Sequence, residues 1–187
     1  MDIKVKSEFK QLIPPLTKAE YDGLETSIIN EGCRDAILVW LQDGSKVIVD
    51  GHNRYEICQK HNIPFETKDI SFESEDDAGA WIIRNQFNRR NLSTYQRSVL
   101  ALQLEDMFRE RGAKNESDGG KGCQISDKVD TKKELAKIAG VSHDTIMRVK
   151  KIEEVSPFFV KEMLAVGDMS INEAYKEIKK KENKNVS

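Results

Sequence analysis

The sequence has no long apolar run and few cysteines, and these absences exclude several classes of protein. Its longest apolar stretch, around residues 36–41, is far too short to span a bilayer. The first six residues are too polar for a signal peptide. The three cysteines, at positions 33, 58 and 123, are odd in number and widely spaced, so they form neither a disulfide framework nor a zinc cluster. We therefore expect a cytoplasmic protein that keeps its thiols reduced.

The chain also has little excess of charge of either sign. Against 30 Lys and Arg it has 32 Asp and Glu, so the formal net charge at pH 7 is -2. This balance is typical of an ordinary globular protein and excludes a basic tail that coats nucleic acid. Any surface that binds nucleic acid must therefore be local. The length of 187 residues is enough for one or two domains with a buried core.

The first half of the chain alternates helix and strand signals. Residues 17–20 form a capping box, which predicts the start of a helix that ends at Gly32. Residues 36–41 and 47–49 predict two strands, joined by a turn signal at residues 43–44. Together these signals indicate a helix followed by a β-hairpin.

A second helix is expected to follow the hairpin without a long loop. The segment Asp50-Gly51-His52-Asn53-Arg54 leads into it, and it should end near residues 61–62. An extended stretch follows over residues 65–70. Ser74 and the acidic residues after it predict another helix start, because the helix dipole favours negative charge in the first turn. This order of elements is typical of a compact α/β domain.

A long helix is expected to connect this domain to the rest of the chain. It begins at the capping box of residues 93–96 and should continue to about Arg111. Residues 113–130 are rich in Gly, Ser, Asn and Asp and have almost nothing to bury, which is typical of a flexible linker. We therefore predict an α+β protein in four parts: an α/β domain over residues 1–91, a connecting helix over 92–112, a flexible linker over 113–130 and an all-α helix-turn-helix domain over 131–187.

Residues 133–149 carry the most specific pattern in the chain, that of a helix-turn-helix. Ala136 is a small residue of the kind needed where two short helices cross steeply, and Gly140 suits the turn because glycine tolerates positive φ. Five apolar residues would hold the two helices together: Leu135, Ala139, Val141, Ile146 and Val149. The alternative interpretation is an ordinary helical hairpin in an all-α bundle.

The second helix of this pattern would present a polar face. Ser142 is expected to cap it, and the residues that point away from the apolar side are of types that contact base edges and phosphates. The predicted partner is double-stranded DNA, and the predicted DNA-binding residues are Ser142, His143, Asp144, Thr145, Met147, Arg148 and Lys151.

The segment at residues 50–54 indicates an anion-binding site. Its glycine lets the backbone approach a ligand, and the N-terminus of the following helix presents unpaired N–H groups. His52 and Arg54 would add charge and donors suited to phosphate. The predicted nucleotide- or anion-binding residues are Asp50, Gly51, His52, Asn53 and Arg54. In the alternative interpretation Asp50-Gly51 is only a tight turn, and Arg54 pairs with a neighbouring carboxylate.

A second polar segment follows the helix that begins after Ser74. Its amides and arginines would extend the same anion site, which adds Gln86, Asn88, Arg89 and Arg90 to the predicted binding residues. Together with Arg84 and Arg97, these arginines could contact nucleotide phosphates or the DNA backbone. The alternative is an exposed basic end of a helix.

With these elements in order, the chain resembles the ParB-like family, in which a ParB/sulfiredoxin-type domain precedes a helix-turn-helix. The resemblance covers roughly residues 9–180, and no single segment in it is specific by itself. The matching segments are residues 16–32, 36–39, 49–55, 85–92 and 155–171.

The resemblance implies sequence-specific DNA binding in plasmid or chromosome partition, or in transcriptional regulation on a mobile element. It also implies a homodimer on the nucleoid, with CTP and Mg²⁺ bound at the boxes that match residues 51–55 and 86–89; a weak CTPase activity is compatible with it. Those boxes usually read Gly-Glu-Arg-Arg and Asn-x-Gln-Arg in partition proteins. Here they read Gly-His-Asn-Arg and Gln-Phe-Asn-Arg. The segment after the last predicted helix is too short for a substantial dimerisation domain, which favours a transcriptional regulator over a partition protein.

Two other functions compete with DNA binding. Some relatives with this fold are similar at Asp50-Gly51-His52 and phosphorylate free serine, with an acid such as Asp50 as general base. A linked helix-turn-helix argues against such a kinase. A further alternative stays open, in which the chain is an adaptor that binds a protein through its first domain and DNA through its second. Sulfiredoxin chemistry is excluded because no cysteine stands at the required position, and we expect neither catalytic residues nor a metal site.

Overall fold

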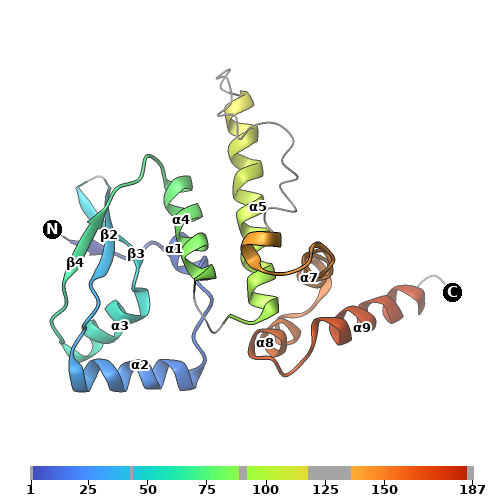
Figure 1. The fold of residues 1–187 in the computed structure, drawn as a ribbon, viewed down its shortest axis with the longest axis horizontal. Coiled ribbons are helices and arrows are strands. Elements are labelled where there is room, and N and C mark those ends of the chain that lie inside the picture. Colours follow the sequence, from blue (N-terminus) through green and yellow to red (C-terminus); the bar gives the residue numbers. More distant parts are fainter. Residues whose placement is uncertain (1, 43, 89–91, 118–135, 185–187) are drawn as a thin grey trace. The chain divides into compact units, whose positions relative to one another are not determined.

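The computed structural model describes residues 2–42, 44–88, 92–117 and 136–184, and the chain divides into two compact units (Figure 1). The first unit comprises Met1–Gln86 and the second Phe87–Ser187. Most of the predicted linker, residues 118–130, lies outside the described residues, and so do Arg89 and Arg90. The predicted limits of the four parts therefore stay a prediction. None of the described helices is long and apolar enough to cross a membrane.

A four-stranded sheet forms the centre of the first unit. The strands are β1 (Ile3–Lys4), β2 (Ile37–Gln42), β3 (Ser45–Asp50) and β4 (Thr67–Ile70), in the order β1-β3-β2-β4. The predicted hairpin is confirmed as the antiparallel pair β2–β3, while β1 runs parallel to β3 and β4 runs parallel to β2. We did not predict β1, because a strand of two residues carries no periodic pattern.

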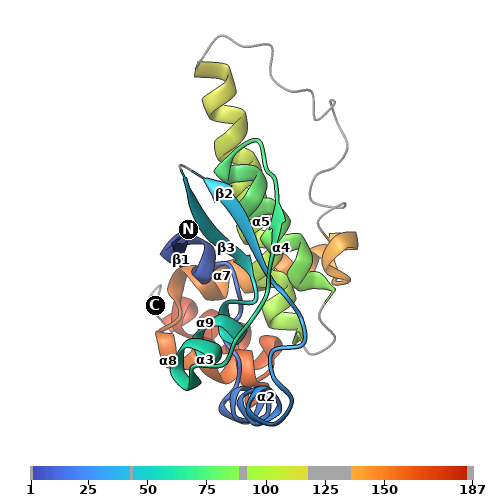
Figure 2. The ribbon, with the colours of Figure 1, turned by 90° about the vertical axis from the view of Figure 1, so that its left-hand side faces the viewer.

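Helices cover both faces of this sheet (Figures 1 and 2). On one face, Val47 and Val49 pack with side chains of α1 (Ser7–Gln11) and α4 (Glu75–Phe87). On the other face, Ile48 packs with residues of β2 and with Tyr55 of α3 (His52–His61). Successive residues of β3 thus serve opposite faces, as the twofold repeat of a strand requires.

The ends of the first long helix follow the sequence signals closely. In α2 (Lys18–Glu31), the Glu20 amide donates to Thr17 Oγ1 over 3.3 Å, and the Thr17 amide donates to Glu20 Oε2 over 2.8 Å. Gly32 ends the helix with a φ of 77°. The predicted capping box and stop are therefore confirmed. α2 packs on α3 through a small cluster centred on Ile28, Ile57 and Cys58.

The second unit is helical throughout its described part. Its helices are α5 (Thr94–Ser117), a short segment at 136–139, α7 (His143–Val155), α8 (Phe158–Val166) and α9 (Ile171–Lys184). The capping box at Ser93 and Gln96 is confirmed. The expected end of α5 near Arg111 is wrong, since the helix runs to Ser117. Residues 113–116 include Ala, Lys and Glu, which are strong helix formers.

One polar network holds three helices of the second unit together. The Tyr95 hydroxyl on α5 donates to the Glu153 carboxylate on α7. Lys161 on α8 lies 3.1 Å from Glu153 Oε2 and also donates to the Glu153 carbonyl over 2.8 Å. Burial, and then the neighbouring Glu153, raise the pKa of Tyr95 well above its usual range, so the hydroxyl stays a donor. Tyr95 also belongs to the apolar core of this unit, together with Val149, Ile152, Val160, Leu164, Ala174 and Ile178.

Candidate functional site

The junction between β3 and α3 has a backbone shape that only glycine adopts readily. Gly51 has a φ of 89° and is the N-cap of α3, and its carbonyl accepts the first helical hydrogen bond from the Tyr55 amide over 2.8 Å. Glycine has no side chain that could cap the helix. The first-turn amides of any α-helix have no acceptor within the helix, and Gly51 supplies no side-chain cap here. Such an N-terminus attracts anions.

The side chain of Arg54 is committed to this junction. Its Nη2 lies 3.3 Å from Asp50 Oδ2 and donates to the Ala36 carbonyl over 3.3 Å. Both partners of the ion pair are largely buried, at 22% exposure for Arg54 and 16% for Asp50. The alternative interpretation, in which Arg54 pairs with a nearby carboxylate, thus describes the structure. A role for Arg54 in binding an anion stays a prediction.

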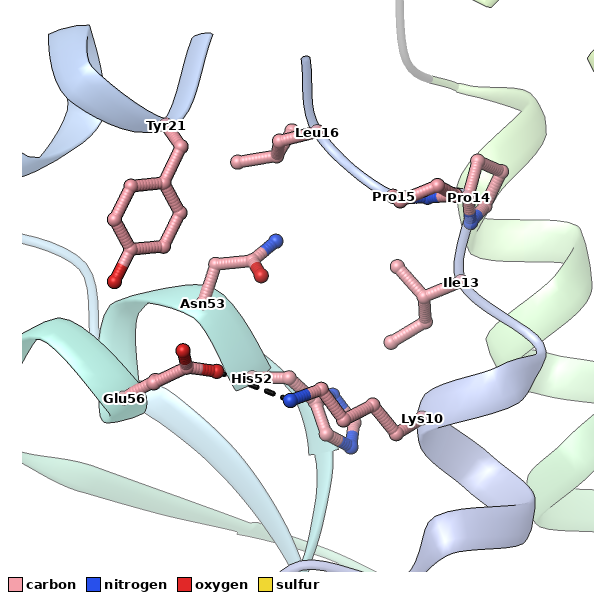
Figure 3. Close-up of a pocket in the computed structure, with 9 residues that line it drawn as sticks. All are labelled: Lys10, Ile13, Pro14, Pro15, Leu16, Tyr21, His52, Asn53 and Glu56. Atoms are coloured by element: carbon pink, nitrogen blue, oxygen red, sulfur yellow. Dashed lines mark hydrogen bonds and ion pairs between the residues drawn. The ribbon is translucent and has the colours of Figure 1, made fainter. Parts of the chain in front are cut away.

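A pocket of about 270 Å³ opens beside the start of α3 (Figure 3). Its apolar wall consists of Ile13, Pro14, Pro15, Leu16 and Tyr21. Its polar lining consists of Lys10, His52, Asn53 and Glu56. Lys10 Nζ donates to Glu56 Oε2 over 3.0 Å, and both side chains are about half exposed. Of the predicted binding residues that the structure describes, His52 and Asn53 line this pocket.

Most of the pocket lining was not predicted from the sequence. Lys10 is a single lysine on a helix of five residues, and no motif surrounds it. It reaches the pocket because α1 lies near α3 in the folded unit. The Pro14-Pro15 pair was the one local signal, since two consecutive prolines mark an extended connection. That signal does not by itself indicate that the connection forms a wall of a site.

The two described residues of the second predicted box, Gln86 and Asn88, do not line the pocket. Gln86 is fully buried in α4, and its Nε2 donates to the Ile82 carbonyl over 3.4 Å. Asn88 follows α4 and is exposed. Arg97, which we considered for phosphate contact, donates to the Ala139 carbonyl over 3.3 Å. That bond ties α5 to the short helix at 136–139.

Residues 136–155 form a helix, a turn and a second helix. The turn lies at Gly140, which has a φ of 66°, and the Val141 amide donates to the Ala136 carbonyl over 3.1 Å. Ser142 caps α7, because its Oγ accepts from the Thr145 amide over 3.2 Å. Ala139 is fully buried, whereas Ala136, which we expected at the helix crossing, is only partly buried.

One side of α7 is fixed in the core and the other side is accessible. Ile146, Val149 and Ile152 are buried. Among the predicted DNA-binding residues, four are exposed and three are half-buried: Ser142, Asp144, Met147 and Arg148, and then His143, Thr145 and Lys151. The accessible side therefore carries a carboxylate, a thioether and a guanidinium within one and a half turns.

Two basic side chains of α7 have partners on α9. Arg148 Nη1 donates to Asn172 Oδ1 over 2.5 Å. Lys151 Nζ lies 3.0 Å from Glu182 Oε1, and this hydrogen bond raises the pKa of Lys151 above its usual value. Lys151 thus stays charged at neutral pH, with its charge partly offset by Glu182.

No family model matches this chain, and no curated protein sequence matches it. Solved structures do match. A Pnob8-like ParB-N domain is 17% identical over 99% of this chain and 79% of its own, with a TM-score of 0.65. A C-terminally truncated Caulobacter crescentus ParB complexed to the centromeric parS site is 15% identical over 92% of this chain and 79% of its own, with a TM-score of 0.49. The same kind of truncated ParB complexed with CTP-gamma-S is 16% identical over 93% of this chain and 86% of its own, with a TM-score of 0.38. The first match confirms the predicted α+β fold as that of a ParB-N domain.

Proposed function

We propose that this chain is a ParB-like protein that binds double-stranded DNA in a sequence-specific manner through α7. The observation that carries the proposal is the arrangement of residues 136–155. A glycine turn and a serine cap set the direction of α7, three buried side chains fix its inner side, and its outer side is accessible. The fold shared with a ParB-N domain supports it.

The dimensions and side chains of α7 suit the major groove. A helix of 13 residues is about 20 Å long, and the groove, about 12 Å wide, admits one helix. In a helix-turn-helix the N-terminal residues of the second helix contact base edges. Arg148 offers a planar fork for the O6 and N7 atoms of guanine, and Met147 offers an apolar contact for a thymine methyl group.

A role in plasmid or chromosome partition, or in transcriptional regulation on a mobile element, belongs to the same proposal. It includes a homodimer on the nucleoid, because helix-turn-helix proteins commonly place two copies on half-sites one helical turn apart. The footprint of such a dimer is a site with twofold symmetry.

Selection of bound sequences from random DNA tests the proposal. We expect one motif to be enriched, and we expect Arg148→Ala to weaken binding to that motif by about 1–3 kcal/mol, roughly 5- to 150-fold. Arg34→Ala is the matched control, because Arg34 is an exposed arginine of the first unit that pairs only with Glu31 among the ion pairs described. Enrichment of no motif, or binding that disappears with modest salt, would contradict the proposal.

We further propose that the pocket beside α3 binds the anionic part of a nucleotide, CTP in the ParB-like interpretation. The N-terminus of α3 at Gly51, the Lys10 ammonium and the side chains of His52 and Asn53 support this. A volume of about 270 Å³ is slightly below the roughly 300–1,000 Å³ of most ligand pockets, so part of a nucleotide would lie outside it. Mg²⁺ would accompany the phosphates as a hard cation with oxygen ligands.

Substitutions of the two partners of the Lys10–Glu56 ion pair should change the nucleotide affinity in opposite directions. Lys10→Ala removes a cation and should weaken binding of CTP with Mg²⁺ by about 1–2 kcal/mol, roughly 5- to 30-fold. Glu56→Gln removes the carboxylate that competes for Lys10 and should strengthen binding by up to about fivefold.

Calorimetry at fixed ionic strength measures both affinities. Lys68→Ala, at an exposed lysine of β4, is the control for the loss of one positive charge. Equal affinities for the wild type and the Lys10 and Glu56 variants would exclude this pocket as the nucleotide site. Formation of phosphoserine when free serine is added would instead favour the kinase alternative.

A further inference from the structure

Arg148 is exposed, yet α9 holds its guanidinium group from two directions. Its Nη1 donates to Asn172 Oδ1 over 2.5 Å, and its guanidinium carbon lies 5.8 Å from the centre of the Tyr175 ring. Asn172 is itself exposed, whereas Tyr175 packs against the apolar core of the second unit. A side chain that would otherwise move freely in water is therefore held between an amide and an aromatic face.

Holding an arginine before it meets its ligand reduces the cost of binding. An exposed arginine loses substantial rotamer freedom when it is immobilised on a partner, and a side chain that is already ordered loses less. The contact with Asn172 uses only one of the five N–H donors of the guanidinium. The remaining donors include enough of the planar fork for a bidentate contact with a base edge.

The aromatic ring of Tyr175 also helps to hold the guanidinium group of Arg148 in place. Tyr175 has a second cation beside it, because Lys179 Nζ lies 5.8 Å from the ring centre. A ring face attracts cations within about 6 Å. Since the core fixes Tyr175, the ring is a rigid surface for Arg148 rather than a mobile neighbour.

We propose that Asn172 and Tyr175 of α9 are positioning residues that preset Arg148 for reading a guanine edge. This inference rests on the proposed DNA-binding function and deepens it. The DNA-reading surface then comprises α7 together with the first two turns of α9. Neither Asn172 nor Tyr175 needs to contact a base, because each acts through the orientation of Arg148.

The test measures a discrimination ratio for the full-length chain. The ratio divides the affinity for the selected DNA motif by the affinity for the same motif with one guanine substituted. That guanine is the one whose substitution no longer weakens binding by the Arg148→Ala variant. We expect Asn172→Ala and Tyr175→Ala each to lower this ratio by roughly two- to tenfold, with the dependence of binding on salt unchanged. Tyr175→Phe keeps the ring face and should retain the wild-type ratio. Glu177→Ala, at an exposed position of the same helix, is the matched control.

A double-mutant cycle separates positioning from a structural role. If Asn172 acts through Arg148, Asn172→Ala should have no further effect on the affinity for the selected motif in the Arg148→Ala background. A ratio unchanged by Asn172→Ala, or an effect that persists without Arg148, would overturn the inference while DNA binding by α7 stands. A wild-type chain that prefers no sequence would instead overturn the proposed function, and this inference with it.

Discussion

Replacing Ile152 with alanine is expected to lower the free energy of unfolding of the second unit by about 2–5 kcal/mol. Ile152 has no exposed surface and lies in the core shared by α5, α7, α8 and α9. The substitution removes buried methyl and methylene groups, and the surrounding helices can fill the resulting cavity only in part. Because native domains are stable by only about 5–15 kcal/mol, this loss is a large part of the stability of the second unit.

Met147→Ala provides the matched control on the opposite side of the same helix. Met147 is 44% exposed, so its truncation should change the free energy of unfolding by less than about 0.5 kcal/mol. Hydrogen exchange of the backbone amides of α7 and α9 measures both effects in the full chain. If Ile152→Ala left exchange unchanged while Met147→Ala accelerated it, the buried and accessible sides of α7 would have been assigned the wrong way round.

Replacing Gly51 with alanine is expected to destabilise the first unit by about 1–3 kcal/mol and to weaken the proposed anion binding at α3. The φ of 89° at this position is unfavourable for any residue with a side chain. The added Cβ would also lie 3.0 Å from Arg54 Nη2, within the network that joins Arg54 to Asp50 and to the Ala36 carbonyl. The strain and the shift of Arg54 both act on the loop that begins α3.

Gly23→Ala should have the opposite effect and serves as the control. Gly23 lies inside α2, and a Cβ added there meets nothing within 4 Å. Alanine should stabilise the helix by about 0.5–1 kcal/mol, because glycine loses more backbone freedom on folding. Thermal unfolding of the full chain, followed with and without CTP, compares the two variants. A Gly51→Ala chain as stable as the wild type would show that the junction adapts to a side chain.

The positions of several helix ends and of the hairpin could be predicted from the sequence because their causes are local. The capping boxes at Thr17 and Ser93 join residues three positions apart. The alternation of apolar residues in β2 and β3 and the glycine at position 140 likewise act over a few residues. Such short-range contacts form in much the same way whatever the rest of the chain does.

The candidate sites required contacts between distant parts of the chain, and only the tertiary structure decided these. Lys10 meets Glu56 across 46 residues, and Arg148 meets Asn172 across 24. The sequence alone identified Arg54 and Arg148 as candidate binding residues, but it left open whether Arg54 pairs with Asp50 and did not reveal that α9 holds Arg148. The partners of a long charged side chain depend on which helices pack beside it, and that packing is determined by the burial of both cores together. The sequence by itself thus determined the local elements and the residue types of the two sites, whereas the folded structure determined which of those residues meet.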